Sequence, residues 1–171
     1  MAALLVEAFQ KHWPNAWPDS ASALEEVHEA LGPERVPRVA VDEHGTVLGW
    51  VGAICGYEGH AWELHPLVVH PAHQRRGIGR ALVADIEQQV RERGGITIYL
   101  GSDDEDAMTT LSGVDLYCDV PGYIASIRNL KGHPYSFYQK VGYTIVGVIP
   151  DANGLGKPDI YMAKRVGRGT S

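Results

Sequence analysis

The stretch that decides the fold is WELHPLVVHPAHQRRGIGRALV, residues 62–83. It begins as an apolar run typical of a β-strand, contains a proline at position 66, and ends in a basic turn with two glycines. A helical spacing of apolar residues starts directly after that turn. This order predicts a strand and a helix with an anion-binding site between them.

The turn at residues 74–80 is suited to phosphate. Gly77 and Gly79 let the backbone approach a ligand, and the free N–H groups at the start of the helix attract an anion. The arginines at positions 75, 76 and 80 add full positive charges. The Walker lysine-serine ending and the third glycine of the dinucleotide fingerprint are both missing, so we do not expect ATP or NAD here.

Pro66 predicts a break in the strand. It has no backbone N–H, so we expect a bulge rather than a fully paired central position, with the sheet splayed there. A bulge leaves unpaired backbone groups, and a pantetheine arm, which itself carries amides, can pair with them as an added strand does. The backbone N–H of Leu67 then becomes a candidate to polarise a reacting carbonyl.

The bulk composition limits the class of protein. A length of 171 residues predicts one domain, residues 1–171, and the net charge of −6 argues against a nucleic-acid partner. No apolar run is long enough for a membrane span, and the first residues are typical of an amphipathic helix rather than a signal peptide. The two cysteines fit neither a disulfide framework nor a zinc site, which favours a reduced, cytosolic setting without a metal.

Strands and helices alternate along the chain, which indicates the α/β class. Ser22 to Glu25 has the pattern of a capping box, so we expect a helix there that packs Leu24, Val27 and Leu31 inward. Leu4 and Phe9 mark an earlier helix. The other expected strands are 36–41, 46–54, 62–69, 96–100, 143–149 and 160–164, and the other expected helices are 78–93, 123–130 and 134–141.

Residues 94–127 contain no lysine or arginine but several acidic residues. A solvated acidic loop and a pocket for a polycation both remain open. The acids are Asp103, Asp104, Glu105, Asp106, Asp115 and Asp119.

The Gln-x-x-Gly-x-Gly turn resembles the signature of the GCN5-related N-acetyltransferase (GNAT) superfamily, which uses acetyl-CoA. Longer blocks, spread over about residues 13–164, are similar to its aminoglycoside 6′-N-acetyltransferases, especially the enterococcal chromosomal type. These blocks are WELHPLVV (62–69), GGITIYLG (94–101), DD (103–104), TTLS (109–112), HPY (133–135), FY (137–138), VGVIP (146–150), ANG (152–154) and KPDI (157–160).

The resemblance implies a mixed, mostly antiparallel sheet flanked by helices, and a homodimer. The family usually opens with a short strand before the first helix. Here Met1 leads straight into the helix, so we expect that strand to be missing or the start codon to be misplaced.

The resemblance also implies roles for residues. Glu63 is expected to be the general base, through a water, and Tyr138 to donate a hydrogen bond or proton to the leaving thiolate. His65 shares a strand face with Glu63 and relays a proton, orients substrate, or is simply packed. The expected acetyl-CoA contacts are Leu67, Val69, Gln74, Arg75, Arg76, Gly77, Ile78, Gly79, Arg80 and Tyr138. The expected contacts to a polycationic drug are Trp13, Glu63, His65, Asp103, Asp104, Asp106 and Asp115.

Three alternative mechanisms or functions remain open. Cys118 as a nucleophile has no activating neighbour in the sequence, so we expect direct acetyl transfer. The acidic segment also suits another cationic amine: a polyamine, a lysine side chain or a protein N-terminus. A non-catalytic acyl-CoA sensor is the third, although Glu63 and Tyr138 are both present.

Overall fold

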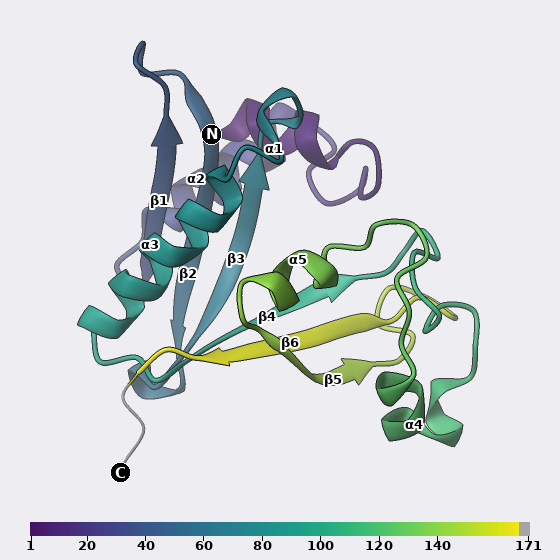
Figure 1. Ribbon diagram of the computed structural model, residues 1–171. Coiled ribbons are helices and arrows are strands. Elements are labelled where there is room, and N and C mark those ends of the chain that lie inside the picture. The colour runs from purple at the N-terminus through teal and green to yellow at the C-terminus, as the bar shows by residue number, and fades with distance from the viewer. Residues whose placement is uncertain (168–171) are drawn as a thin grey trace. The chain divides into compact units, whose positions relative to one another are not determined.

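The computed structural model describes residues 1–167, which fold into two compact units. The first contains residues 1–98 and the segment that begins at Arg165, and the second contains residues 99–164. In the described chain the six strands have the order β1-β2-β3-β4-β6-β5 (Figure 1). They form one mixed, mostly antiparallel sheet, which confirms the predicted character of the sheet. A single functional domain over residues 1–171 stays a prediction.

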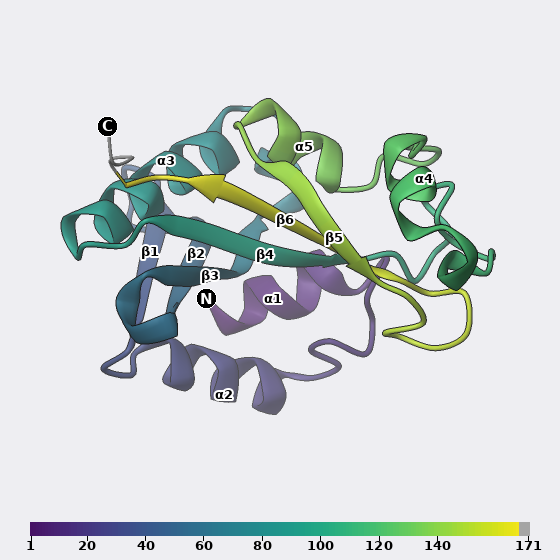
Figure 2. The ribbon, with the colours of Figure 1, turned by 90° about the horizontal axis from the view of Figure 1, so that it is seen from below.

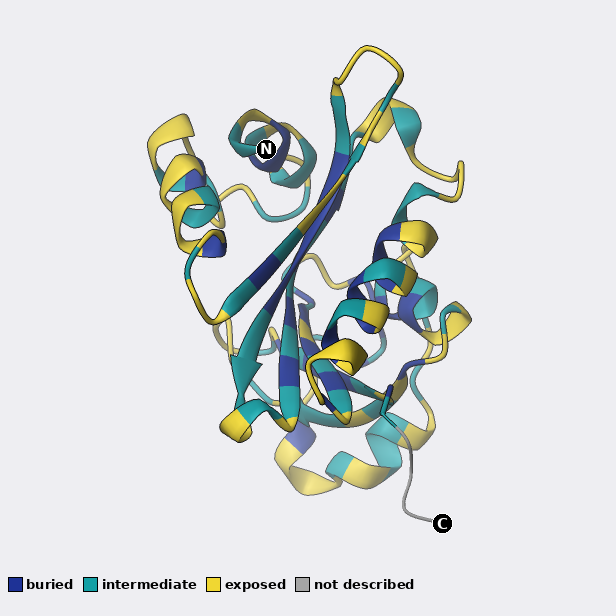
Figure 3. Ribbon diagram, turned by 90° about the vertical axis from the view of Figure 1, so that its left-hand side faces the viewer, coloured by how far each residue is buried: buried dark blue, intermediate teal, exposed yellow. Residues whose placement is uncertain are grey.

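The first unit is a three-stranded antiparallel sheet with helices on both faces. α1 and α2 cover one face of β1–β3, and α3 covers the other (Figures 2 and 3). α3 buries the apolar stripe that the sequence predicts, and Gly94 ends it in a left-handed conformation. The elements are α1 (Ala2–Phe9), α2 (Ser20–Ala30), β1 (Arg35–Val41), β2 (Val47–Gly56), β3 (Ala61–Val69), α3 (Ile78–Glu92) and the first residues of β4 (Thr97–Asp103).

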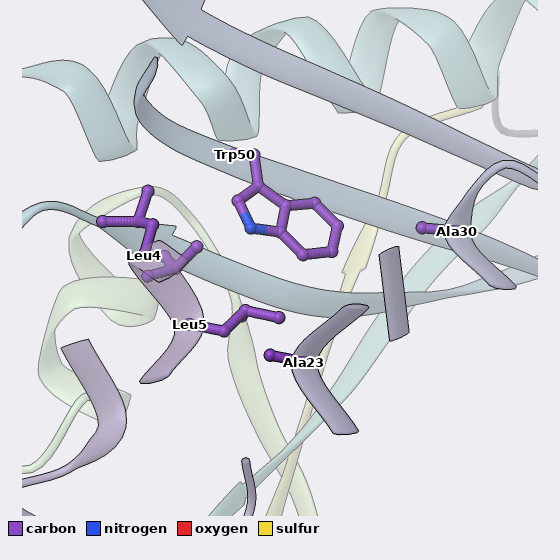
Figure 4. Close-up of a cluster of buried hydrophobic side chains, with 6 residues drawn as sticks. Leu4, Leu5, Ala23, Ala30 and Trp50 are labelled. Atoms are coloured by element: carbon purple, nitrogen blue, oxygen red, sulfur yellow. The ribbon is translucent and has the colours of Figure 1, made fainter. Parts of the chain in front are cut away.

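Trp50 of β2 is the centre of the core beneath α1 and α2. Its side chain is fully buried among Leu4 and Leu5 of α1 and Ala23 and Ala30 of α2 (Figure 4). The two alanines let α2 approach the indole ring closely. This cluster holds α1 and α2 against the strand face that carries the candidate catalytic residues.

The expected start of α2 is wrong, and of its three expected inward residues only Val27 packs against the core cluster. The N-cap is Asp19, whose carboxylate accepts hydrogen bonds from the backbone N–H of Ala21 and Ser22. An aspartate accepts both bonds at once, so the helix begins before the predicted capping box. Leu24 and Leu31 are 48% and 66% exposed, because the stripe that contains Ala23 and Ala30 faces the sheet instead.

The second unit contains β4 after its first residues, α4 (Val120–Ala125), α5 (Tyr135–Lys140), β5 (Thr144–Ile149) and β6 (Asp159–Arg165). β5 and β6 pair in antiparallel register. The helix expected at 123–130 is displaced towards the N-terminus: Asp119 caps it, and it ends at Ala125. Asn129 instead forms a β-bridge with Thr109, which is incompatible with a continuing helix.

Candidate active site

β3 contains the bulge that Pro66 predicts. In the antiparallel pairing of β2 and β3, Val51 lies opposite Leu67 and Ala53 lies opposite Leu64. Between these two pairs β2 advances by two residues and β3 by three, so β3 contains one extra residue, at the proline. The splaying of the sheet at this strand stays a prediction.

Gly52 makes room for the bulge, and the sequence reasoning missed it. A Cβ atom at this position would collide with the backbone oxygen of His65. The available signal was a glycine inside an otherwise apolar strand, a pattern that often marks a bulge or a close approach of two backbones.

The extra residue exchanges the two faces of β3. Trp62 pairs with Cys55 and Val68 pairs with Trp50, and these two partners are five residues apart on β2. They therefore lie on opposite faces, although Trp62 and Val68 are an even number of residues apart. An unbroken strand would have placed both on one face.

Glu63 and His65 face α1 and α2. Glu63 pairs with Ile54, which shares the face of Trp50 on β2. The His65 ring contacts Trp17, with 5.9 Å between ring centroids. The bulge thus leaves both candidate residues on the face that the N-terminal helices cover.

Glu26 of α2 also lies at this face, and the sequence reasoning missed it. Its Oε2 is 3.7 Å from Nε2 of His65, and its Oε1 is 3.7 Å from Nη1 of Arg35. The imidazole of His65 holds the pKa of Glu26 below its usual range, against the opposing effect of burial. An acid between Ala23 and Ala30, within the buried stripe of α2, was the available signal.

Aromatic rings extend from His65 towards the end of α1. Trp17 makes an edge contact with Phe9 at 4.6 Å, and Phe9 lies 5.8 Å from Trp13. Trp17 packs against the core cluster and also touches the candidate catalytic face. Trp13, the residue expected near a sugar, is half-buried in the same series of rings.

The glycine turn precedes α3 as predicted. Gly77 is the N-cap residue, with a φ of 89° that favours glycine. The Gln74 side chain donates to the backbone oxygen of Val69 at 3.2 Å, which ties the turn to the end of β3. Arg76 lies 3.0 Å from Nδ1 of His73. The exposed arginines of the turn are Arg75, Arg76 and Arg80.

The first N–H groups of α3 point out of the helix end, because an α-helix pairs each N–H with the carbonyl four residues earlier. The first such bond runs from Ala81 to Gly77. The N–H groups without a partner inside the helix belong to Ile78, Gly79 and Arg80. Together with the exposed guanidinium groups they form a cationic surface suited to a pyrophosphate.

The acidic loop of the second unit contains aspartates in different environments. Asp104 is fully buried, and its carboxylate accepts backbone N–H groups of Met108 at 2.6 Å and Thr109 at 2.8 Å. Asp104 therefore organises the loop, and the expected contact between Asp104 and the drug is not part of the proposed site, because both carboxylate oxygens already accept backbone N–H groups. Asp103 is half-buried and binds the side-chain amide of Asn153.

Asp106 and Asp115 are exposed in the same unit. Asp115 accepts a hydrogen bond from the backbone N–H of Tyr117 at 3.1 Å and from the thiol of Cys118 at 3.3 Å. The bond to Asp115 raises the pKa of the Cys118 thiol. A raised pKa reduces the thiolate fraction, which agrees with the expectation that Cys118 is not a nucleophile.

Tyr138 lies on α5 in the second unit and is buried. Its ring makes edge contacts with Phe137 and Tyr143, at 5.3 Å and 5.8 Å between ring centroids. Burial raises the pKa of its phenol, so the hydroxyl stays protonated at neutral pH. A protonated phenol is able to donate to a thiolate.

The structure therefore groups the predicted residues within each unit. Glu63, His65, Leu67 and the glycine turn belong to the first unit, and Tyr138 and the aspartates belong to the second. Within residues 1–167 no helix is long and apolar enough to cross a membrane. The same described part of the chain contains no group of three or more His, Cys, Asp or Glu side chains arranged to hold a metal ion.

Comparison with known proteins gives consistent matches. The model of the acetyltransferase (GNAT) family matches residues 2–110. A crystal structure of an aminoglycoside 6′-N-acetyltransferase complexed with coenzyme A is 48% identical, with a TM-score of 0.91 over 99% of this chain and 93% of that chain. The aminoglycoside 6′-N-acetyltransferase from Enterococcus faecium is also 48% identical, with a TM-score of 0.88 over the same shares.

A curated relative, the L-methionine sulfoximine/L-methionine sulfone acetyltransferase of Salmonella typhimurium (strain LT2), is 29% identical over 92 residues. That match spans about half of each protein, 52% of this chain and 52% of the relative.

Proposed function

This chain belongs to the acetyltransferase (GNAT) family, and on that premise we propose that it transfers the acetyl group of acetyl-CoA to the 6′-amine of aminoglycosides. The observation that carries the proposal is the likeness over 99% of the chain, at 48% identity, to an aminoglycoside 6′-N-acetyltransferase complexed with coenzyme A. Acetylation removes a positive charge from the drug, and antibiotic resistance is the proposed consequence.

The glycine turn is the proposed site for the pyrophosphate of acetyl-CoA. The exposed arginines and the free N–H groups at the start of α3 supply positive charge in a protein whose net charge is −6. The turn is tied to the last residue of β3 by Gln74. The pantetheine arm would pair with backbone groups of β3 from Leu67 to Val69, beyond the bulge.

The chemistry requires a neutral amine, because an ammonium has no lone pair. Glu63 is proposed to accept the proton of the ammonium through a water. The amine nitrogen then bonds to the thioester carbon, the backbone N–H of Leu67 stabilises the oxyanion, and the carbon–sulfur bond breaks. The protonated phenol of Tyr138 is proposed to supply the proton that the leaving thiolate takes up. The amide nitrogen loses its second proton to solvent as the carbon–sulfur bond breaks, and the Tyr138 phenolate takes a proton back from solvent.

Asp103, Asp106 and Asp115 are the proposed contacts for the other ammonium groups of the drug. They belong to a sequence segment without lysine or arginine, residues 94–127, whose negative charge attracts a polycation. Lys131, beyond this segment, donates a hydrogen bond to the backbone oxygen of Asp106. Trp13 is proposed to cover a sugar ring with its apolar face. We also propose that the protein is a homodimer in the cytosol. Sedimentation at micromolar concentration tests the dimer.

The test is thiol release from acetyl-CoA by the purified protein. Kanamycin A is compared with a matched aminoglycoside that carries a 6′-hydroxyl, and spermidine and a lysine peptide are included. Turnover with the 6′-amine and little with the 6′-hydroxyl drug supports both the reaction and its position. Turnover only with spermidine or the peptide would move the substrate to another cationic amine, and acetyl-CoA binding without any turnover would favour an acyl-CoA sensor.

A further inference from the structure

α2 places an acidic side chain against the strand face that carries the candidate catalytic residues. The Glu26 side chain is only 14% exposed, and its Oε2 lies 3.7 Å from Nε2 of His65. At this separation the carboxylate acts on the ring as a nearby negative charge and not through a direct hydrogen bond. The two residues are 39 positions apart in the sequence and meet only because α2 packs over β1–β3.

We propose that Glu26 is a positioning residue, which acts through His65 by holding the imidazole against Trp17 with its Nε2 atom protonated. The inference rests on the proposed function, in which His65 takes part at the face shared with Glu63. Glu26 itself is not proposed to touch the substrate.

The chemistry of the ring explains what this achieves. A neutral imidazole carries its proton on one nitrogen and accepts hydrogen bonds at the other. A carboxylate beside Nε2 favours the tautomer with the proton on Nε2, which leaves Nδ1 as the acceptor. Trp17 contacts the same ring, with 5.9 Å between ring centroids, so a negative charge and an aromatic ring both restrict the imidazole.

A purely structural role is a weaker explanation for Glu26. Arg35 of β1 already joins α2 through Glu29, whose Oε2 lies 2.9 Å from its Nη2. The distance from Arg35 to Glu26 is longer, at 3.7 Å. The link between α2 and β1 therefore does not depend on Glu26. The pairing with His65 does, because within the described residues Glu26 is the acid paired with that ring. Keeping a carboxylate in this mostly buried place costs solvation free energy, which the facing imidazole offsets.

The test uses the full chain labelled with ¹⁵N in its histidine rings. Long-range ¹H–¹⁵N spectra at pH 7.5 report which ring nitrogen of His65 carries the proton, and His65→Asn assigns the signal. In the wild-type protein we expect Nε2 to be protonated. Glu26→Gln keeps the shape of the side chain but removes the charge, and Glu29→Gln is the matched control on the same helix and the same arginine.

We expect Glu26→Gln to move the His65 ring signals towards a mixture of tautomers and to lower kcat for kanamycin A about tenfold. This loss is below the 10²–10⁴ typical of removing a direct acid or base. The KM for acetyl-CoA should stay within about twofold, because the glycine turn is unaffected. Glu29→Gln should leave the ring signals and kcat near wild type, with both variants shown to be folded by their melting temperatures.

Unchanged His65 ring signals in folded Glu26→Gln would overturn the proposal, and so would an equal change in Glu29→Gln. The spectra need no substrate, so they separate this inference from the proposed function. If the wild-type protein acetylates no aminoglycoside, the proposed function fails, and the ring signals still decide whether Glu26 sets the tautomer of His65.

Discussion

His133 joins the acidic loop to the helix that carries Tyr138 through a hydrogen bond to Asp103. The ring is almost fully buried, and its Nε2 lies 3.1 Å from the backbone oxygen of Asp103, at the end of β4. Its Nδ1 accepts the backbone N–H of Tyr135, the first residue of α5, at 3.2 Å. A neutral imidazole with its proton on Nε2 satisfies both bonds, and a charged one would lose the second.

Protonation of His133 should therefore destabilise the protein in acid. Burial lowers the pKa of His133 below its usual 6.5, although the bond to Asp103 and nearby acids oppose the shift. Between the folded pKa and pH 6.5 the unfolded chain therefore binds more protons than the folded one. The contribution of neutral His133 to the free energy of unfolding is complete above pH 6.5 and decreases as the pH falls through this range. Urea unfolding at a series of pH values from 8 to 5 measures this decrease.

Replacement of the ring provides the control. His133→Gln should lower the free energy of unfolding at pH 8, because it disturbs a buried bridge, but should flatten its dependence on pH between 8 and 5. His44→Gln, at an exposed turn residue, should keep the wild-type dependence. An equally steep dependence in His133→Gln would assign the acid sensitivity to other groups.

Gly52→Ala should destabilise the first unit. The new methyl group would meet the backbone oxygen of His65, and backbone cannot move aside as a flexible side chain does. We expect a loss of about 1–3 kcal/mol in the free energy of unfolding. Because the displaced backbone belongs to the bulge beside Glu63, kcat should fall as well.

Gly147→Ala is the matched control for this effect. Gly147 also lies in a strand, but a Cβ atom there has no neighbour within 4 Å. Denaturant unfolding of both variants compares a crowded glycine with an open one. Equal stability of Gly52→Ala and Gly147→Ala would mean that the bulge accommodates a side chain.

The features that could be predicted from the sequence are those with a local cause. Pro66 lacks an N–H, so its bulge follows from its own chemistry. Gly77 and the apolar residues after it define the turn and the helix for the same reason. The mixed, mostly antiparallel character of the sheet is different in kind, because it was expected from the resemblance to a family and not from local patterns.

The features that could not be predicted depend on contacts between distant segments. Leu24 and Leu31 were expected to face inward because leucine is the larger apolar residue, whereas the bulky Trp50 is packed by Ala23 and Ala30, with Val27 beside them. Glu26 escaped notice because its partner His65 lies on another element. The burial of Asp104 could not be predicted either, because the sequence does not distinguish an aspartate that binds backbone N–H groups from one that faces solvent.

Arg76→Ala should weaken acetyl-CoA binding with little effect on the drug. The guanidinium is exposed in the turn before α3, where a pyrophosphate would accept its hydrogen bonds. We expect the KM for acetyl-CoA to rise about tenfold, equivalent to roughly 1.4 kcal/mol. Arg93→Ala, at the other end of α3, is the control and should leave this KM unchanged. A rise in the aminoglycoside KM alone would show that the turn does not hold the phosphates.

Tyr138→Phe should lower kcat with little change in either KM. Burial raises the pKa of the Tyr138 phenol, so the wild-type group is a proton donor throughout the neutral range. Loss of a general acid typically costs about 10²-fold or more. Tyr135→Phe, a buried tyrosine of the same helix, is the control for packing. Matching losses in the two variants, with matching losses of stability, would point to a packing role for Tyr138.

Glu63→Gln tests the base. A glutamine cannot accept the proton of the ammonium, so we expect kcat to fall by about 10²-fold near pH 6.5. The loss should shrink as the pH rises, because a larger fraction of the amine is already neutral and needs no base. Steady-state rates at saturating acetyl-CoA from pH 6 to 9 measure this trend. A loss of equal size at every pH would assign Glu63 to holding the ammonium rather than deprotonating it, and full activity at every pH would remove it from both roles.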